Sequence, residues 1–267
     1  MKPLISISIL LITPIMLFAQ TDTIGRFTVS IGGGLALPVG SYASHDANEA
    51  AVFRGKDYGN KILGFSKKKN GFAETGYSVN LDIDYSLSSK WFVFIRGGYL
   101  SNKINTETMV DFFHNEYVEA NVPVLPTTVD HDDMNVLYLA PGIGYQFRIH
   151  KLHLGLSAFA GWGWSNYPGY LVVANDFFHF GQKWDSPHLC DGCEAPNLSS
   201  AVFGGILSVK YFMSNRVSLG LEISYFQSGF DYTMQNYHWP GGGPVSPFDD
   251  TVVIRLFNPQ FKVGYSF

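Results

Sequence analysis

Apolar and polar residues alternate with a period of two near the carboxyl end of the chain. Phe261, Val263, Tyr265 and Phe267 are apolar, and the residues between them are polar or small. This alternation is typical of a β-strand with one apolar and one polar face. A strand that ends on an aromatic residue is expected where a membrane barrel closes against its first strand. We therefore expect this segment to close the barrel and to direct its insertion.

The same alternation predicts seven further strands and so an all-β, eight-stranded, antiparallel, up-and-down transmembrane barrel. The connections alternate between long and tight, which is typical of outer-membrane barrels with long extracellular loops and short periplasmic turns. An even number of strands then places both termini in the periplasm. Pro141 lies inside a predicted strand, where we expect a local bulge or bend. The predicted strands cover residues 26–37, 76–87, 91–103, 134–148, 151–164, 198–212 and 216–229, and an eighth strand after the loop 230–249 ends at Phe267.

The composition agrees with a membrane barrel and argues against a helical membrane protein. The chain has 46% hydrophobic, 16% aromatic and only 15% charged residues, against about 25% charged residues in ordinary soluble domains. The mean hydropathy is only +0.05, because alternate residues of a membrane barrel face lipid and dilute the apolar signal. A soluble sandwich or lipocalin-like barrel remains the alternative. The net charge of −4 and the lack of a basic surface beyond Lys67–Lys69 argue against a nucleic-acid partner.

The amino-terminal segment has the features of a secretory signal peptide. Lys2 is followed by an apolar stretch over residues 4–18 and by the small residue Ala19. A positive start, an apolar core and a small residue at the cleavage site are typical of such signals. We expect residues 1–19 to be the signal peptide and residues 20–267 to form the barrel.

The exported chain of eight alternating strands carries two short glycine motifs, Ile31-Gly-Gly-Gly-Leu35 and Val263-Gly-Tyr-Ser-Phe267. With these features the sequence resembles the small outer-membrane β-barrel domain family of Gram-negative bacteria (eight-stranded, OmpA-transmembrane-like). The resemblance implies a monomer in the cell outer membrane, in contact with outer-membrane lipid and with the barrel-assembly machinery during insertion. Family members include structural barrels, adhesins, secretion-system components and lipid-modifying enzymes.

Six charged residues fall on the predicted inward faces of the strands. Isolated charges in such a lumen cost several kcal/mol each, so we expect them to form an ion-pair network. Their spacing from the tight turns places Asp82, Arg96 and Glu222 at one depth. Lys210 and Lys262 are expected nearer Asp84. A gated ion path is the alternative, although an eight-stranded barrel has room for little besides side chains. The six residues are Asp82, Asp84, Arg96, Lys210, Glu222 and Lys262.

Two residue sets could carry chemistry. His153 and Ser157 lie on one inward face and could form a Ser-His-acid set with Glu222, but a lipid-modifying hydrolase needs that set facing lipid, so we expect no catalytic residue. Cys190 and Cys193 lie in one long loop, where a disulfide is expected in an oxidising compartment. A zinc site with His179 or His188 and a redox pair are the alternatives. We expect neither a metal nor a cofactor.

The long loops are rich in aromatic residues, as at Trp184, Tyr232 and residues 177–180 and 237–239. Such residues either form a binding surface or pack against one another above the barrel. We therefore expect a non-enzymatic outer-membrane barrel, porin-like in architecture, with a side-chain-filled lumen. Its loops would bind an unknown extracellular ligand or protein or support the envelope. A passive small-solute channel, a secretion-system or assembly component and a lipid A-modifying enzyme are the alternatives.

Overall fold

The computed structural model describes most of the region expected to form the barrel and parts of its long connections. The described residues are 27–53, 62–119, 127–131, 133–166, 170–176, 184–185, 197–234 and 248–267. The predicted signal peptide, the predicted disulfide between Cys190 and Cys193, and the aromatic residues of 177–180 and 237–239 lie outside the described residues.

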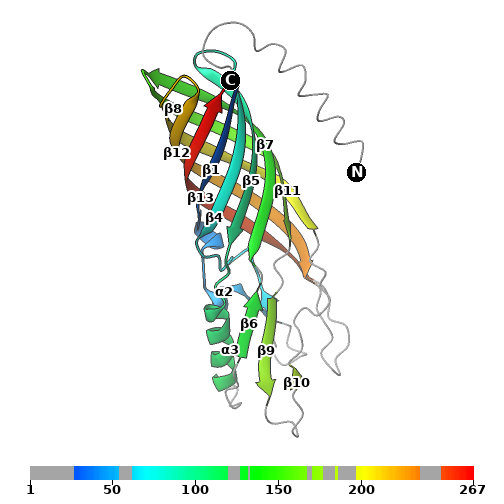
Figure 1. Cartoon of the computed structure of the whole chain (residues 1–267). Coiled ribbons are helices and arrows are strands. Elements are labelled where there is room, and N and C mark those ends of the chain that lie inside the picture. The colour runs from blue at the N-terminus through cyan, green and yellow to red at the C-terminus, as the bar shows by residue number, and fades with distance from the viewer. Residues whose placement is uncertain are drawn as a thin grey trace.

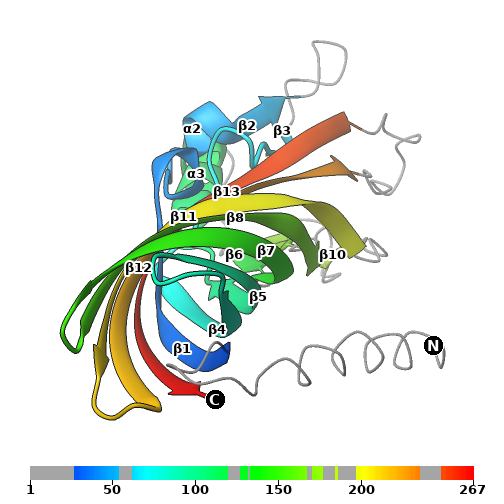
Figure 2. The ribbon, with the colours of Figure 1, turned by 90° about the horizontal axis from the view of Figure 1, so that it is seen from above.

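Eight strands form a closed antiparallel barrel, as the alternation predicted (Figures 1 and 2). Each strand pairs with the next barrel strand along the chain, and the last pairs with the first, with Thr28 opposite Ser266 and Ile31 opposite Val263. The predicted closure by the carboxyl-terminal strand is therefore confirmed. The barrel strands are β1 (Phe27–Pro38), β4 (Gly76–Ser86), β5 (Trp91–Asn102), β7 (Met134–Ile149), β8 (Leu152–Asn166), β11 (Asn197–Phe212), β12 (Val217–Met234) and β13 (Phe248–Ser266).

Tight turns join β4 to β5, β7 to β8 and β11 to β12, and all three lie at the same end of the barrel as Phe267 (Figure 1). We call this end the turn end and the opposite end the loop end. Strands β12 and β13 are longer than predicted, because they stay paired as far as Met234 and Phe248. Phe230 was expected to be the first residue of a loop over residues 230–249. In the structure it is fully buried and continues the inward face of β12. The alternation thus extends beyond the predicted boundary.

The expected irregularity at Pro141 is not a bulge. Leu139 pairs with Trp162 and Gly142 pairs with Phe159, so both strands advance by three residues across the proline. A bulge would add a residue to one strand. The ladder between β7 and β8 is interrupted at residues 140 and 141 while its register stays unchanged, which is the effect of a missing backbone N–H.

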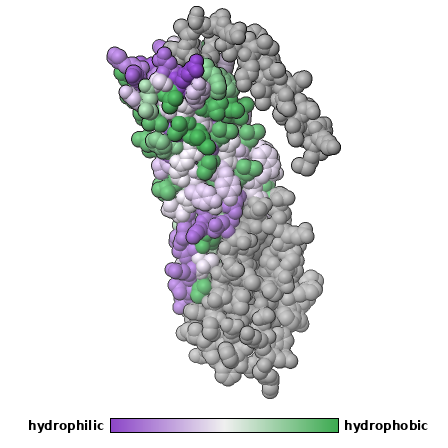
Figure 3. Space-filling model, viewed as in Figure 1, coloured by the Kyte–Doolittle hydropathy of each residue, from purple (hydrophilic) through white to green (hydrophobic). Residues whose placement is uncertain are grey.

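A belt of exposed apolar side chains surrounds the barrel strands. Leu81, Ile143 and Leu221 are 48%, 50% and 65% exposed, whereas the residues between the apolar positions face inward. The hydropathy surface shows this belt as a green band next to a hydrophilic rim at the turn end (Figure 3). A barrel with its apolar side chains outside and its polar side chains inside is suited to lipid rather than water. We therefore treat the barrel as spanning a membrane.

Several elements that the sequence analysis assigned to loops lie towards the loop end (Figure 1). Strands β2 and β3 form a two-stranded sheet, and β6, β9 and β10 form a three-stranded sheet from two different long connections. No helix among the described residues is long and apolar enough to cross a membrane. These elements are η1 (Gly40–Tyr42), α2 (Ala47–Ala50), β2 (Ala51–Phe53), β3 (Ile62–Phe65), α3 (Glu107–Glu119), β6 (Thr127–His131), β9 (Tyr170–Asp176) and β10 (Trp184–Asp185).

The first long connection and α3 share a small apolar core, which we call the loop-end cluster. It comprises Tyr42, Phe65, Phe72, Met109 and Phe112, all at most 5% exposed. The Phe65 ring lies 5.7 Å from Phe72 and 5.6 Å from Phe112, both in edge-on geometry. The loop-end cluster gives these connections a buried core of their own at the loop end of the barrel.

Candidate functional site

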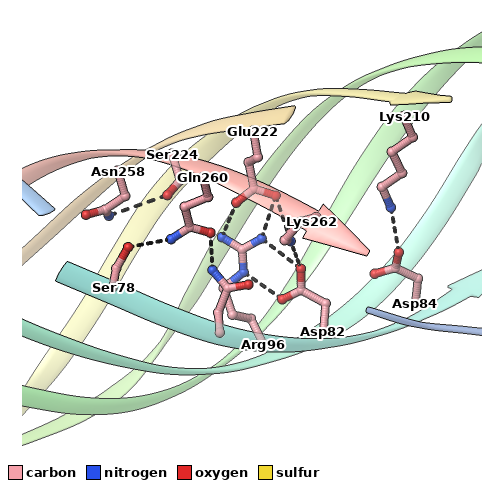
Figure 4. Close-up of polar contacts among 11 residues, drawn as sticks. Ser78, Asp82, Asp84, Arg96, Lys210, Glu222, Ser224, Asn258, Gln260 and Lys262 are labelled. Carbon is pink, nitrogen blue, oxygen red and sulfur yellow. Dashed lines mark hydrogen bonds and ion pairs between the residues drawn. The ribbon is translucent and has the colours of Figure 1, made fainter. Parts of the chain in front are cut away.

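Four charged side chains meet inside the barrel at its centre (Figure 4). The guanidinium of Arg96 donates to both carboxylate oxygens of Asp82, at 2.7 and 2.9 Å. It also forms an ion pair with Glu222 at 2.8 Å. The Lys262 ammonium contacts Glu222 at 2.7 Å and also binds Asp82. We call these four residues the central ion cluster.

The central ion cluster is closed to solvent and balanced in charge. Its four residues are only 1–4% exposed, and its two carboxylates face two cations. Buried charges are tolerated when geometry and hydrogen bonds replace the lost water, and here each charged group has two oppositely charged neighbours. The cluster therefore fills the lumen with a compact set of side chains from β4, β5, β12 and β13.

The other two predicted lumen charges form a separate pair. Lys210 donates to Asp84 at 2.9 Å, nearer the turn end (Figure 4). Lys262 was expected nearer Asp84, with Asp84 or Glu222 as its partner. It pairs with Glu222, but the expected depth near Asp84 is wrong, because the strand register decides its depth. Lys262 is opposite Gly32, which is opposite Asn80. Along β4, Asn80 lies two residues from Asp82 and four from Asp84, so Lys262 joins the central ion cluster.

An aromatic cluster, which the sequence analysis did not identify, fills the lumen beside the charges. Its members are buried. Four of them lie opposite a glycine of the neighbouring strand: Phe92 faces Gly144, Phe94 faces Gly142, Tyr138 faces Gly98 and Phe159 faces Gly204. A Cβ atom on any of these glycines would collide with the opposing ring. The glycines therefore provide the space that the rings occupy, as when an aromatic side chain covers a glycine in a neighbouring strand. We call Phe92, Phe94, Tyr138, Phe159 and the adjacent Phe226 the lumen aromatic cluster.

The aromatic cluster also contacts the central charge. The Arg96 guanidinium carbon lies 5.9 Å from the Phe94 ring centroid and 5.7 Å from that of Phe159. Cations are attracted to ring faces at such distances. The signal that could have found these rings is the parity of β5, because Phe92 and Phe94 share an inward face with Arg96.

Towards the loop end, the lumen is filled by apolar side chains. Each of these residues is at most 1% exposed, so these side chains have almost no contact with water. Together with the central ion cluster and the lumen aromatic cluster, they occupy successive levels of the barrel. The apolar residues are Leu100, Val136, Val202, Phe230, Ile254 and Leu256.

His153 and Ser157 both lie inside the barrel. The His153 ring centroid lies 4.4 Å from that of Phe212, with the two rings tilted by 44°. Ser157 is 7% exposed and lies opposite Gly144. Neither side chain is placed on the lipid face that a lipid-modifying hydrolase uses. Among the described residues, no group of three or more metal-ligating side chains is placed to hold a metal ion.

At the loop end, Asp250 of β13 anchors the first long connection to the barrel. Its carboxylate accepts hydrogen bonds from the Ser66 hydroxyl at 3.1 Å, the Lys67 backbone N–H at 2.7 Å and the Tyr232 hydroxyl at 2.8 Å. Within the first long connection, the Ser66 backbone N–H donates to the Ala50 carbonyl and the Gly71 backbone N–H donates to the Ser41 carbonyl. Tyr232, expected in an aromatic loop surface, lies in β12 and serves this anchor.

The Lys67 side chain is buried with the anchor. It is 1% exposed and its ammonium lies 5.3 Å from the Phe72 ring centroid. Burial lowers the pKa of Lys67 to about 7, although Asp250 opposes this by favouring the charged form. Docking therefore favours the neutral form of Lys67 relative to the undocked state.

We predict that docking of residues 66–73 weakens as the pH falls from about 10 to about 7. The docked pKa lies below the ordinary value of about 10.4, so the undocked state binds more protons in this interval and docking gains stability as the pH rises. Amide protection factors should fall by up to about tenfold per pH unit in this range. Hydrogen exchange, corrected for intrinsic rates, measures them at Gly71 and Phe72.

The matched variant for this experiment is Lys67→Met, which keeps the length and removes the titrating group. Its protection factors should not vary with pH. A Lys68→Met variant, at the exposed neighbouring position, should retain the native profile. An equal pH dependence in native protein and Lys67→Met would show that another group controls docking.

Comparisons with known proteins give distant structural likenesses. No family model matches the chain, and no curated protein matches it significantly. The outer membrane protein OprG from Pseudomonas aeruginosa is 12% identical, with a TM-score of 0.46, and the match covers 93% of this chain and 99% of that one. Outer membrane protein W of E. coli is 16% identical, with a TM-score of 0.39 and coverage of 92% and 100%. Neisserial surface protein A is 12% identical, with a TM-score of 0.37 and the same coverage.

Proposed function

We propose that this chain, which folds as a closed eight-stranded barrel, is a non-conducting anchor in the bacterial outer membrane that acts through its loop end at the cell surface. The observation that carries the proposal is the filled lumen. The central ion cluster, the lumen aromatic cluster and the apolar section follow one another across the barrel, and their residues are at most 9% exposed. A lumen occupied in this way suits a membrane anchor rather than a passage.

Three features support a surface role for the loop end. The loop-end cluster gives the first connection and α3 a buried core, and Asp250 binds that connection to β12 and β13. Tight turns leave the turn end without comparable structure. We infer that the ordered loop end faces the exterior and presents a surface to a partner or ligand, with the turn end in the periplasm.

Planar bilayer recordings test the non-conducting lumen. Purified native protein should give no steady, voltage-independent openings, while a general porin in the same bilayer gives them. Steady openings of the native protein that change with Arg96→Gln would contradict the proposal, since the current would then pass the central ion cluster.

Labelling of intact cells tests the orientation in the same proposal. A cysteine at Glu107, exposed at the start of α3, should react with a membrane-impermeant maleimide above the background of the native chain. A cysteine at Lys90, exposed in the β4–β5 turn, should react only after the outer membrane is permeabilised. The reverse pattern would place the turn end outside and overturn the surface role.

A further inference from the structure

A cavity at the turn end opens inside the mouth of the barrel, and its lining is basic. It has a volume of about 450 Å³ and is lined by Arg148, Lys151 and Arg216 together with two histidines. No aspartate or glutamate is among its lining residues. Three permanent positive charges therefore converge on one cavity without a carboxylate side chain to balance them.

The inward carboxylate of the neighbouring cavity already has a partner. Asp84 lines a smaller neighbouring cavity, but it accepts a hydrogen bond from Lys210 at 2.9 Å. Lys210 and Asp84 thus neutralise each other, so Asp84 does not balance the charges of Arg148 and Arg216.

Arg148 gives an independent indication that something binds in this mouth. Its Nε atom is buried and has no hydrogen-bond partner among the described residues. Buried polar donors in folded proteins are nearly always satisfied, so an exception calls for an explanation. An anion held by the guanidinium would supply the missing acceptor, because arginine binds phosphate and carboxylate through paired N–H donors.

We propose that the turn-end mouth binds a small phosphate-bearing molecule. Three fixed positive charges match a group with two or more negative charges, such as a phosphomonoester or diphosphate, better than a single carboxylate. His150 and His153 add ring nitrogens that can donate hydrogen bonds, and Phe212 provides an apolar wall for the remainder of the ligand. The volume lies within the range of small-molecule sites.

Isothermal titration of the full chain with pyrophosphate, in zwitterionic detergent at fixed ionic strength, tests this site. Native protein should show one saturable site. Arg148→Gln and Arg216→Gln should each weaken binding by about tenfold or more, since each removes a charge-assisted hydrogen bond. The matched control is Lys90→Gln, which makes the same charge change at the same end of the barrel but lies outside the cavity lining.

The outcomes separate a built site from general attraction between charges. Saturable binding that depends on Arg148 and Arg216 but changes less than about twofold in Lys90→Gln supports the proposal. No saturable binding, or an equal loss in all three variants, overturns it. Arg216 is exposed, so Arg216→Gln keeps the test decisive even where Arg148→Gln fails to fold.

Phosphate could reach the mouth from a soluble compound or from a phospholipid headgroup, and nanodiscs distinguish the two. If anionic phosphatidylglycerol weakens pyrophosphate binding relative to phosphatidylcholine, a lipid headgroup competes for the site. Equal binding in the two lipids shows that a net negative headgroup does not compete, which favours a soluble phosphate compound. At about 0.15 M salt, lipid charges more than about 8 Å from the cavity are largely screened.

Discussion

Replacing Arg96 by methionine should lower the free energy of unfolding by about 3–5 kcal/mol, the usual cost of removing one partner from a buried ion pair. The change leaves Asp82 and Glu222 buried with Lys262 as their remaining cation in the central ion cluster. The loss of packing against Phe94 and Phe159 adds to this cost. Urea unfolding of the protein in lipid vesicles, followed by tryptophan fluorescence, measures the change.

The double variant Arg96→Met with Asp82→Asn separates charge imbalance from lost packing. It removes one cation and one anion, so Glu222 and Lys262 remain as a balanced pair at 2.7 Å. We expect it to be more stable than Arg96→Met alone. An exposed control, Arg216→Gln, should change stability by less than about 0.5 kcal/mol. A double variant less stable than Arg96→Met would mean that charge balance does not determine the stability of the central ion cluster.

Replacing Gly98 by alanine should also destabilise the barrel, by about 1–3 kcal/mol, the range found for overpacked cores. The new methyl group would overlap the Tyr138 ring, which lies directly opposite. That ring cannot move freely, because Phe159 stacks on it and Phe226 lies 5.1 Å away. The same urea experiment gives the magnitude.

The adjacent residue provides the matched control. A Cβ atom on Gly97 would meet nothing within 4 Å, because Gly97 lies on the opposite face of β5. Gly97→Ala should therefore be neutral or slightly stabilising, since alanine restricts the unfolded chain more than glycine does. Equal losses in the two variants would mean that backbone conformation, rather than the Tyr138 ring, requires these glycines.

The barrel could be predicted because each strand has two different faces and a period of two reports them directly. Ile31 and Leu81 face outward and Ser78 and Asp82 face inward, as the alternation indicated. The inward position of a charge follows from its own strand, so six lumen charges were identified, although Arg148, which lines the turn-end cavity, was not among them. The shared depth of Asp82, Arg96 and Glu222 could be predicted from their distance to the tight turns. The position of Lys262 could not, because it depends on the stagger between strands.

The lumen rings and the loop end were missed for two different physical reasons. The parity of β5 indicates that Phe94 faces inward. Its packing over Gly142 depends on the register between β5 and β7, which no single strand contains. The helix α3 lies in a segment without period-two alternation, which was therefore assigned to a loop. A local signal was present, because the Asn105 side chain accepts a hydrogen bond from the Thr108 backbone N–H at 3.3 Å, as helix-capping residues do.

The origin of the four central charges has a consequence for how the barrel assembles. Asp82 and Arg96 are direct cross-strand partners in the hairpin β4–β5, while Glu222 and Lys262 belong to the hairpin β12–β13. Each pair of adjacent strands can therefore form a neutral ion pair by itself, before the sheet closes. Closure later joins two neutral pairs, so neither hairpin has to carry an uncompensated charge into the bilayer, where a charge is costly. Only after the first and last strands meet can Lys262 reach Asp82, 180 residues away along the chain.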